Sequence, residues 1–164
     1  MTIAAGLCAG LVAGVPSWAQ SYPDRPIRVI VPMQAGTAGD TIMRIVTQKM
    51  STSIGQTLVI QNVPDAAGLV GEERIEHAGP DGYTIGAMGD SLLTVLPHLV
   101  KMSYDPVKDL APVTMLASVA NIVVVRKDSP YKTMTELMDA ARARPGEVTF
   151  GSVGVGSSGQ LSAG

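Results

Sequence analysis

Residues 26–32 read Pro-Ile-Arg-Val-Ile-Val-Pro, an almost continuous apolar run between two prolines. Such a run is typical of a strand that is covered on both faces, as in a parallel sheet. A helix-like segment follows from Asp40 and stops at Gly55, a residue suited to a left-handed helix end. A strand that leads directly into a helix predicts an α/β fold. The residues expected on the buried face of this helix are Ile42, Ile45, Val46 and Met50.

The same alternation of strands and helices continues along the chain, which predicts a mainly parallel sheet. Further strands are expected at 57–63, 83–88, 110–119, 122–126 and 148–152. Helices are expected at 68–79, at 91–100 with an interruption near Pro97, and from Thr133 to about Arg144. The last of these begins with a capping box formed by Thr133 and Glu136. Residues expected on the solvent side of the 68–79 helix are Glu72, Glu73, Arg74 and Glu76.

Composition excludes several classes of function. Hydrophobic residues make up 46% and charged residues 16% of the 164 positions, so the chain has the composition of a folded protein. The net charge of −2, the lack of a basic cluster and an aromatic content of 4% argue against nucleic acid and anionic membranes as partners. The single cysteine and the two separated histidines lack the spacing of a metal site. We therefore expect no metal, no cofactor and no enzymatic activity.

The first nineteen residues have the features of an export signal. Residues 3–15 are apolar and uncharged, but they are too few for a membrane span, which needs about 20 residues. Ser17-Trp18-Ala19 then supplies a small-x-small cleavage pattern. The segment 1–19 is therefore predicted to be a signal peptide that is cleaved after Ala19, with a buried N-terminal helix as the alternative.

The loop between the first strand and its helix, residues 32–40, is the first predicted ligand site. Its glycines permit close approach of the backbone to a ligand. The first N–H groups of the following helix lack internal partners and carry partial positive charge, which suits a carboxylate. The residues predicted to bind ligand here are Gly36, Thr37, Ala38 and Asp40. Asp40 leaves an alternative open, because its own carboxylate could cap the helix in an ordinary βα turn.

A second glycine- and serine-rich loop, residues 151–160, has the same character. Its predicted ligand-binding residues are Gly154, Gly156, Ser157 and Ser158, and Ser91 is added from the expected 91–100 helix. Neither loop contains Lys or Arg, so neutral amides and hydroxyls would have to hold an anion, which favours a small carboxylate. The spacing Gly154-x-Gly156-x-x-Gly159 also matches a dinucleotide fingerprint. A nucleotide-dependent α/β enzyme is therefore a rival hypothesis.

Several motifs, taken in order, resemble one family. The opening strand Tyr22–Pro32, the turn Pro80–Thr84, the segment Tyr104–Val113 and Phe150-Gly151-Ser152 with Gly156-Ser157-Ser158 are all similar to stretches of the Bug family. Asp40, Asn62, Pro64 and Gly68 also stand where that family places the same residues. Bug proteins are the extracytoplasmic receptors of tripartite tricarboxylate transporters. Thr37 and Gln160 depart from the family pattern, which usually has Gly and frequently has His at these places.

The resemblance implies a periplasmic binding protein-like fold of type II, in which two α/β domains close on a ligand like a clamp. It implies a periplasmic receptor, monomeric at full length, that grips a small carboxylate between the two loops and delivers it to the transporter's membrane subunits. Residues 22–117 would form the first domain, incomplete without a C-terminal return, and residues 118–164 the truncated start of the second. A truncated fragment that binds no solute, or that has a sensory role, is the third hypothesis.

Overall fold

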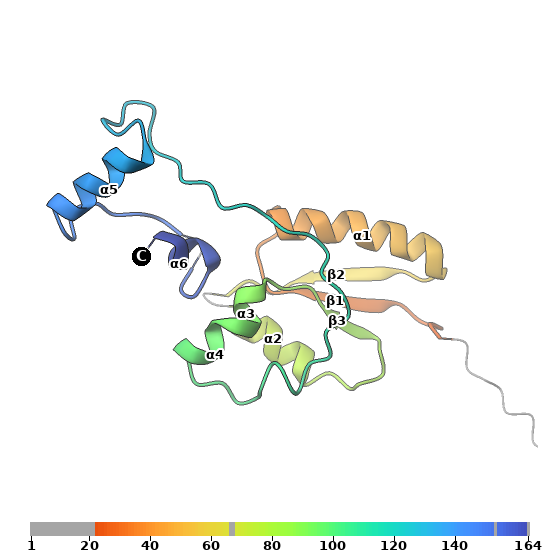
Figure 1. Ribbon diagram of the computed structural model, residues 1–164. Helices are drawn as coiled ribbons and strands as arrows, with labels where there is room; N and C mark the ends of the chain where they lie inside the picture. Colours follow the sequence, from red (N-terminus) through yellow and green to blue (C-terminus); the bar gives the residue numbers. More distant parts are fainter. Residues whose placement is uncertain (1–21, 66–67, 153, 164) are drawn as a thin grey trace, which may run out of the picture.

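A computed structural model describes residues 22–65, 68–152 and 154–163, and its centre is a small parallel sheet (Figure 1). The strands are β1 (Ile27–Val31), β2 (Leu58–Asn62) and β3 (Thr84–Gly86), in the order β2-β1-β3. Both pairings of β1 are parallel. The first three predicted strands and the parallel sheet are therefore confirmed. The predicted signal peptide and its cleavage after Ala19 lie outside the described residues.

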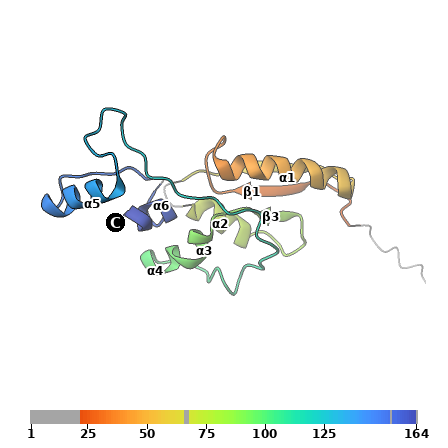
Figure 2. The same cartoon turned by 45° about the horizontal axis from the view of Figure 1, so that its top comes forward.

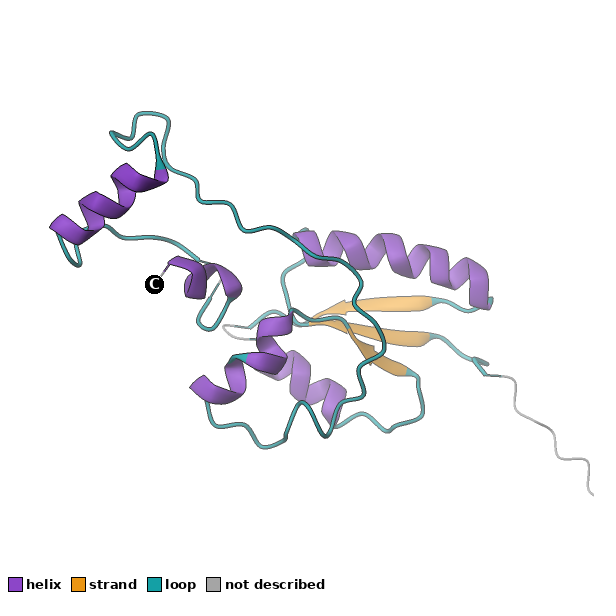
Figure 3. Ribbon diagram, viewed as in Figure 1, coloured by secondary structure: helices purple, strands orange, loops and turns teal. Residues whose placement is uncertain are grey.

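Two helices cover opposite faces of this sheet, α1 (Ala38–Ile54) on one side and α2 (Leu69–Glu76) on the other (Figures 2 and 3). The core between the sheet and α1 consists of Ile27, Val29, Val31, Met43, Leu58 and Ala87. The remaining helices are α3 (Asp90–Thr94), α4 (Leu96–Leu99), α5 (Met134–Ala143) and α6 (Ser158–Ala163). Within the described ranges, no helix combines the length and apolar character that a bilayer crossing requires.

The helix ends follow the capping signals in the sequence. Gly55 ends α1 with φ of 70°, a left-handed conformation that glycine adopts without steric cost. Thr133 and Glu136 form the predicted capping box at the start of α5, and Arg144 caps its other end. The expected 91–100 helix is divided at Val95, and Pro97 lies in the first turn of α4, where its missing N–H is tolerated.

The buried face of α1 differs from the prediction. Its buried residues are Asp40, Met43 and Thr47, whereas Ile45 is 58% exposed and Met50 is 37% exposed. The Asp40 carboxylate accepts a hydrogen bond from Asn62 at the end of β2, at 2.9 Å. This polar contact fixes the rotation of the helix about its axis and turns the predicted apolar face partly toward solvent.

The predicted strands at 110–119, 122–126 and 148–152 do not form. These residues are extended or irregular without ladder pairing, and apolar side chains such as Val113 and Val124 are 90% and 82% exposed. A β-prone sequence becomes a strand only when a neighbour satisfies its backbone N–H and C=O groups. The described chain gives these segments no such neighbour. Residues 110–126 instead run as an extended connector from the sheet unit toward α5 (Figures 1 and 3).

The predicted solvent side of α2 is also wrong at one position. Glu72 is 0% exposed, while Glu73 and Arg74 on the same helix are exposed. The helix ends at Glu76, earlier than the predicted Gly79. Its close approach to the sheet is possible because Gly71, also buried, lies directly against Pro32. That approach brings the next residue, Glu72, into the interior.

The segment before β1 is fastened to the Pro80–Tyr83 turn by polar contacts. The Tyr83 hydroxyl donates to Asp24 at 2.6 Å, and the Arg25 guanidinium lies 4.1 Å from the centre of the Tyr83 ring. Arg25 also pairs with Asp81 at 2.8 Å. The hydrogen bond to the ionised Asp24 raises the pKa of Tyr83, since loss of the phenol proton would break it. These contacts set where β1 begins.

We expect the change Tyr83→Phe to lower the melting temperature by about 3 °C, because two hydrogen bonds are lost at an exposed site: the one that the hydroxyl donates to the Asp24 side chain and the one that it accepts from the Asp24 N–H. Thermal unfolding followed by circular dichroism measures this. Asp24→Ala should cause a smaller loss, because the backbone N–H at position 24 still donates to the Tyr83 hydroxyl, and the double variant should lose no more than Tyr83→Phe alone. Additive losses would show that the two side chains do not act through one bond.

Candidate functional site

The loop that leaves β1 is organised around the buried side chain of Asp40, which is 1% exposed. Its Oδ2 accepts from the Gly36 N–H at 2.8 Å, and its Oδ1 accepts from Asn62 Nδ2 at 2.9 Å. The Arg44 guanidinium pairs with both oxygens, at 2.9 and 3.1 Å. The carboxylate thus ties together the loop, the second turn of α1 and the end of β2.

These contacts keep Asp40 ionised and its charge paired. The hydrogen bond from Arg44, followed by those from the Gly36 N–H and from Asn62, holds the pKa of Asp40 far below its usual range. Arg44 in turn has its pKa raised by the same carboxylate. Neither open alternative for Asp40 describes these bonds: Thr37 is the N-cap of α1, and the Asp40 carboxylate is bonded to the Gly36 N–H before the helix and to two side chains. Asp40 acts on the loop, and its oxygens are already occupied by protein donors.

The donors that remain free lie next to Asp40. Thr37 is the N-cap of α1, and its side chain accepts from the Asp40 N–H at 3.4 Å. The N–H groups of Ala38 and Gly39 have no acceptor in the described part of the chain, as is usual for the first positions of a helix. They project from the positive end of a 17-residue helix. This pair of adjacent N–H groups can hold one oxygen of an anion.

The second predicted loop has the same bonding. The Gly156 N–H donates to Gln160 Oε1 at 2.6 Å, and the Ser157 hydroxyl accepts from the Gln160 N–H at 3.3 Å. The N–H groups of Ser158 and Gly159 have no acceptor among the described residues. The loop thus also presents two adjacent free donors, although residues 148–152 before it form no strand.

The chain fold brings the second loop toward the first. Both views show α6 on the side of the sheet where the chain leaves β1 and enters α1 (Figures 1 and 2). Gly156 is buried there against α4, and a Cβ added to it would lie 3.3 Å from Leu99 and 3.4 Å from Leu96. Ser91, the remaining predicted residue, is half-buried in α3, and its N–H is bonded to the side chain of Asp90.

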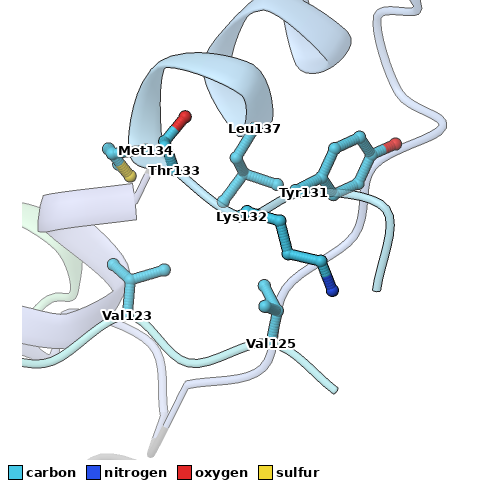
Figure 4. Close-up of a pocket in the computed structure, with 7 residues that line it drawn as sticks. All are labelled: Val123, Val125, Tyr131, Lys132, Thr133, Met134 and Leu137. Atoms are coloured by element: carbon cyan, nitrogen blue, oxygen red, sulfur yellow. The ribbon is translucent and has the colours of Figure 1, made fainter. Parts of the chain in front are cut away.

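A shallow pocket lies elsewhere, between α5 and the connector (Figure 4). Its lining residues are Val123, Val125, Tyr131, Lys132, Thr133, Met134 and Leu137. None of the predicted ligand-binding residues is among them. Its valines belong to the connector that the sequence predicts to be a strand, so the hollow lies beside an unpaired segment and not at the end of a sheet.

Two alternative kinds of site find little support. No group of three or more His, Cys, Asp or Glu side chains in the described ranges is placed to hold a metal ion. The glycine spacing at 154–159 needs a strand before it and a helix after it to bind a dinucleotide. The second loop has a six-residue helix after it and no strand before it.

Three residues that complete the loops were not predicted as site residues. They are Arg44, which neutralises Asp40, Asn62, which anchors it to β2, and Gln160, which holds the second loop. A signal for one of them is present in the sequence. Gly36-Thr37-Ala38-Gly39-Asp40 and Gly156-Ser157-Ser158-Gly159-Gln160 share the order of glycine, hydroxyl residue, small residue, glycine and carbonyl-bearing side chain.

Comparison with known proteins gives a consistent family. The family described as "Tripartite tricarboxylate transporter family receptor" matches residues 42–164. A protein from Cupriavidus necator, "UPF0065 protein in gbd 5'region", is 37% identical over 154 residues, which cover 93% of this chain and 47% of the relative. The chain therefore spans about half the length of this relative.

Solved structures show the same fold. "R. palustris Rpa4515 with adipate" is 32% identical with a TM-score of 0.78, over 87% of this chain and 48% of that one. "MatC (Rpa3494) from Rhodopseudomonas palustris with bound malate" is 29% identical with a TM-score of 0.61, over 74% of this chain and 42% of that one. The predicted periplasmic binding protein-like α/β fold is thereby confirmed for the part of the fold that the chain covers.

Proposed function

The chain belongs to the tripartite tricarboxylate transporter receptor family, and we propose that it is part of a solute-binding receptor that captures a small dicarboxylate. Two of the similar structures are named as holding adipate and malate, and both of these compounds are dicarboxylates. The observation that carries the proposal is the pair of free N–H groups in each of the two loops, at Ala38 and Gly39 and at Ser158 and Gly159. Uncharged donors of this kind suit a carboxylate oxygen.

The proposed binding residues follow from this geometry. Ala38, Ser158 and the backbone around Thr37 and Ser157 would contact the ligand. Gly36 and Gly156 would act by allowing the turn, because their N–H groups are already bonded within the protein. Asp40 would position the first loop, Gly154 would position Ser157 by accepting from its hydroxyl at 2.7 Å, and Ser91 would line the same side of the sheet.

The wider biology extends the same proposal. Residues 22–117 would form the first domain and residues 118–164 the start of the second, so that the clamp closes across the two loops. The receptor would be exported to the periplasm through the leader-like segment 1–19, act as a monomer and deliver its ligand to the transporter's membrane subunits. Capture and delivery require no chemical step.

Calorimetric titration of the full-length protein with adipate, malate and their methyl esters tests the proposal. We expect saturable binding of at least one free acid and none of its ester, since esterification removes the charge that the N–H groups attract. Binding should also raise the melting temperature, by an amount that grows with the logarithm of ligand concentration once this exceeds the Kd. Absence of binding by either acid and by other dicarboxylates of similar length would contradict the assignment, and saturable binding of a nucleotide would favour the enzyme hypothesis.

Substitution of Gly36 tests the first loop. Gly36 has φ of 84° and no atom within 4 Å of an added Cβ, so Gly36→Val would strain the backbone and displace the loop without a clash in the core. We expect affinity to fall about tenfold, the equivalent of one lost hydrogen bond to a charged ligand. Gly146→Val is the matched control, because Gly146 has φ of 81°, equally open surroundings and no part in either loop. Equal affinity in the two variants would remove Gly36 from the site.

Ser158→Ala tests the second loop. Ser158 is exposed at the start of α6, so removal of its hydroxyl should leave the fold intact. We expect a loss of affinity of about threefold, because a neutral hydroxyl donor contributes about 0.5–1.5 kcal/mol. Ser162→Ala, on the same helix and four residues later, serves as the control in the same titration. An effect of Ser162→Ala that equals that of Ser158→Ala would argue against contact between Ser158 and the ligand.

A further inference from the structure

The two loops share one hydrogen-bond pattern, although one lies near residue 36 and the other near residue 156. Gly36 and Gly156 both have a left-handed backbone, with φ of 84° and 75°. Four residues after each glycine a side-chain oxygen returns to accept its N–H: Asp40 Oδ2 at 2.8 Å in the first loop and Gln160 Oε1 at 2.6 Å in the second. We call Asp40 and Gln160 the braces of the loops.

The remaining bonds match one by one. The hydroxyls of Thr37 and Ser157 each donate to the carbonyl three residues earlier, at 2.9 and 2.7 Å, and the N–H groups of the same two residues point at that same carbonyl, at 3.4 and 3.3 Å. Each hydroxyl accepts from the N–H of its brace, at 3.4 and 3.3 Å. Four hydrogen bonds of one loop match four of the other, and the two glycines have similar φ angles. The two loops therefore have one conformation, although their side chains differ.

The pattern also explains which N–H groups stay free. In each loop the brace occupies the N–H of the glycine and the hydroxyl occupies the N–H of the brace. What remains is the pair between them, Ala38 with Gly39 and Ser158 with Gly159. Loss of a brace would free the glycine N–H and let the loop change its conformation, so the direction of the two remaining donors depends on the brace.

The braces differ in one respect, their charge. Asp40 is a carboxylate, and Arg44 neutralises it through two bonds of 2.9 and 3.1 Å. Gln160 is an uncharged amide, and among the described residues its side chain is bonded only to the Gly156 N–H. Each brace therefore presents no net negative charge, by an ion pair in one loop and by an amide in the other. An uncompensated carboxylate at either place would repel an anionic ligand.

From this we infer that Asp40 and Gln160 are matched positioning residues for the ligand's carboxylate, which hold the free N–H pairs of the two loops in place and which must carry no uncompensated charge. The inference rests on the proposed function. It predicts that two properties of each brace, its acceptor oxygen and its lack of net charge, can be separated by mutation.

Gln160 allows the separation most directly. Gln160→Met removes the acceptor at nearly constant size, so the Gly156 N–H should exchange with solvent faster and dicarboxylate affinity should fall about tenfold. Gln160→Glu keeps the acceptor but adds a charge, so the Gly156 N–H should stay protected while affinity falls by a similar factor. Because that second loss is electrostatic, it should shrink when salt is raised to about 0.5 M, whereas the loss in Gln160→Met should not.

The first loop supplies the corresponding pair. Asp40→Ala removes the brace, whereas Arg44→Met keeps the brace but leaves its charge uncompensated. The Gly36 N–H should therefore lose protection from solvent exchange in Asp40→Ala and keep it in Arg44→Met. Nuclear magnetic resonance on the full-length protein measures the amide exchange. Calorimetry with adipate and malate measures the affinity. Glu136→Ala is the control, because Glu136 closes the capping box of α5, which has no part in the loops, and there affinity should stay within twofold.

The outcomes separate this inference from the proposed function. If the wild-type protein binds a dicarboxylate and both Gln160 variants bind it equally well, the braces have no positioning role and the receptor assignment stands. If the salt response is the same in Gln160→Met and Gln160→Glu, neutrality is not required and the inference fails in that half. If the wild-type protein binds no dicarboxylate, the proposed function and the inference are both overturned.

Discussion

Replacement of Glu72 by methionine is expected to raise the free energy of unfolding at pH 7 by about 2 kcal/mol, because it removes an unpaired carboxyl from the interior. Glu72 is 0% exposed, and among the described residues neither of its carboxyl oxygens has a hydrogen-bond partner. The Tyr104 hydroxyl, also buried and without a partner of ordinary geometry, lies beside it. Methionine has nearly the same length and no group that needs water, so it fills the space without this penalty.

The pH dependence of the gain identifies its cause. Burial raises the pKa of Glu72 above its ordinary value of 4.5, so the folded protein binds this proton more tightly than the unfolded chain does. The penalty is therefore present when the pH lies above the raised pKa, and it fades as the pH falls toward 4.5. The stability difference between Glu72→Met and the wild-type protein should be largest at neutral pH and should shrink under acid conditions.

Denaturant unfolding of both proteins at several pH values between 4 and 8 measures this difference. Glu73→Met is the matched control, because Glu73 is the neighbouring glutamate on α2 and is exposed, and its stability should change by less than about 0.5 kcal/mol. Tyr104→Phe tests the other group in this contact, the Tyr104 hydroxyl, whose pKa is raised above its ordinary value chiefly by burial. A loss of stability in Glu72→Met at neutral pH would mean that the carboxyl has a partner that stabilises the fold.

The case of Glu72 also shows which features of the fold the sequence could predict. The strand at 26–32 was predictable because its apolar run is continuous, and Gly55 and the Thr133–Glu136 capping box were predictable because each acts within one turn of chain. Burial of Glu72 depends instead on how closely α2 approaches the sheet. Four charged residues within five positions are the composition of a solvated helix face. The periodic pattern of a helix does not reveal how far the helix lies from the sheet.

The strands predicted at 110–119 and 122–126 fail for a related reason. Their valines and isoleucine have high β-propensity, but propensity describes how well a side chain fits a pleated surface, and the pairing itself needs a second backbone. The exposed side chains of Val123 and Val124 show that no such surface is present in the described chain. The local sequence determines the β-propensity of a segment, but the strand with which it would pair lies elsewhere in the sequence.

The two candidate loops were predicted in outline but not in their internal bonds, and ligand binding by them stays a prediction. Both loops were located, since glycines between an apolar run and a helix start are visible in the sequence. The role of Asp40 was left between ligand contact and helix cap, whereas in the structure Thr37 is the cap and Asp40 is bonded to Gly36, Arg44 and Asn62. Arg44 and Asn62 could not be predicted as its partners, because only the folded chain brings the second turn of α1 and the end of β2 to the same carboxylate.

Gly71 gives the second large effect. Its Cβ position lies 2.7 Å from Pro32 Cβ, closer than real Cβ atoms approach, and 3.1 Å from Pro32 Cα, so one chain must move to admit a side chain. Pro32 follows β1 and cannot rotate out of the way, because its ring is fixed to the backbone. A side chain at position 71 must therefore push α2 away from the sheet. The same movement would disturb the start of the loop that begins at Pro32.

We expect Gly71→Val to lower the free energy of unfolding by about 3 kcal/mol, the range for overpacking that the surroundings cannot relieve, with an added cost for a β-branched residue in a helix. Gly79→Val is the control, because an added Cβ there meets no atom within 4 Å and the change should cost less than about 1 kcal/mol. Denaturant unfolding compares the two.

Because Pro32 leads into the Gly36 loop, Gly71→Val should also weaken dicarboxylate binding, so stability and affinity fall together in this variant. In Gly36→Val, by contrast, we expect affinity to fall more than stability. Equal stability of Gly71→Val and Gly79→Val would mean that α2 and the end of β1 are not held at the close distance on which the burial of Glu72 also depends.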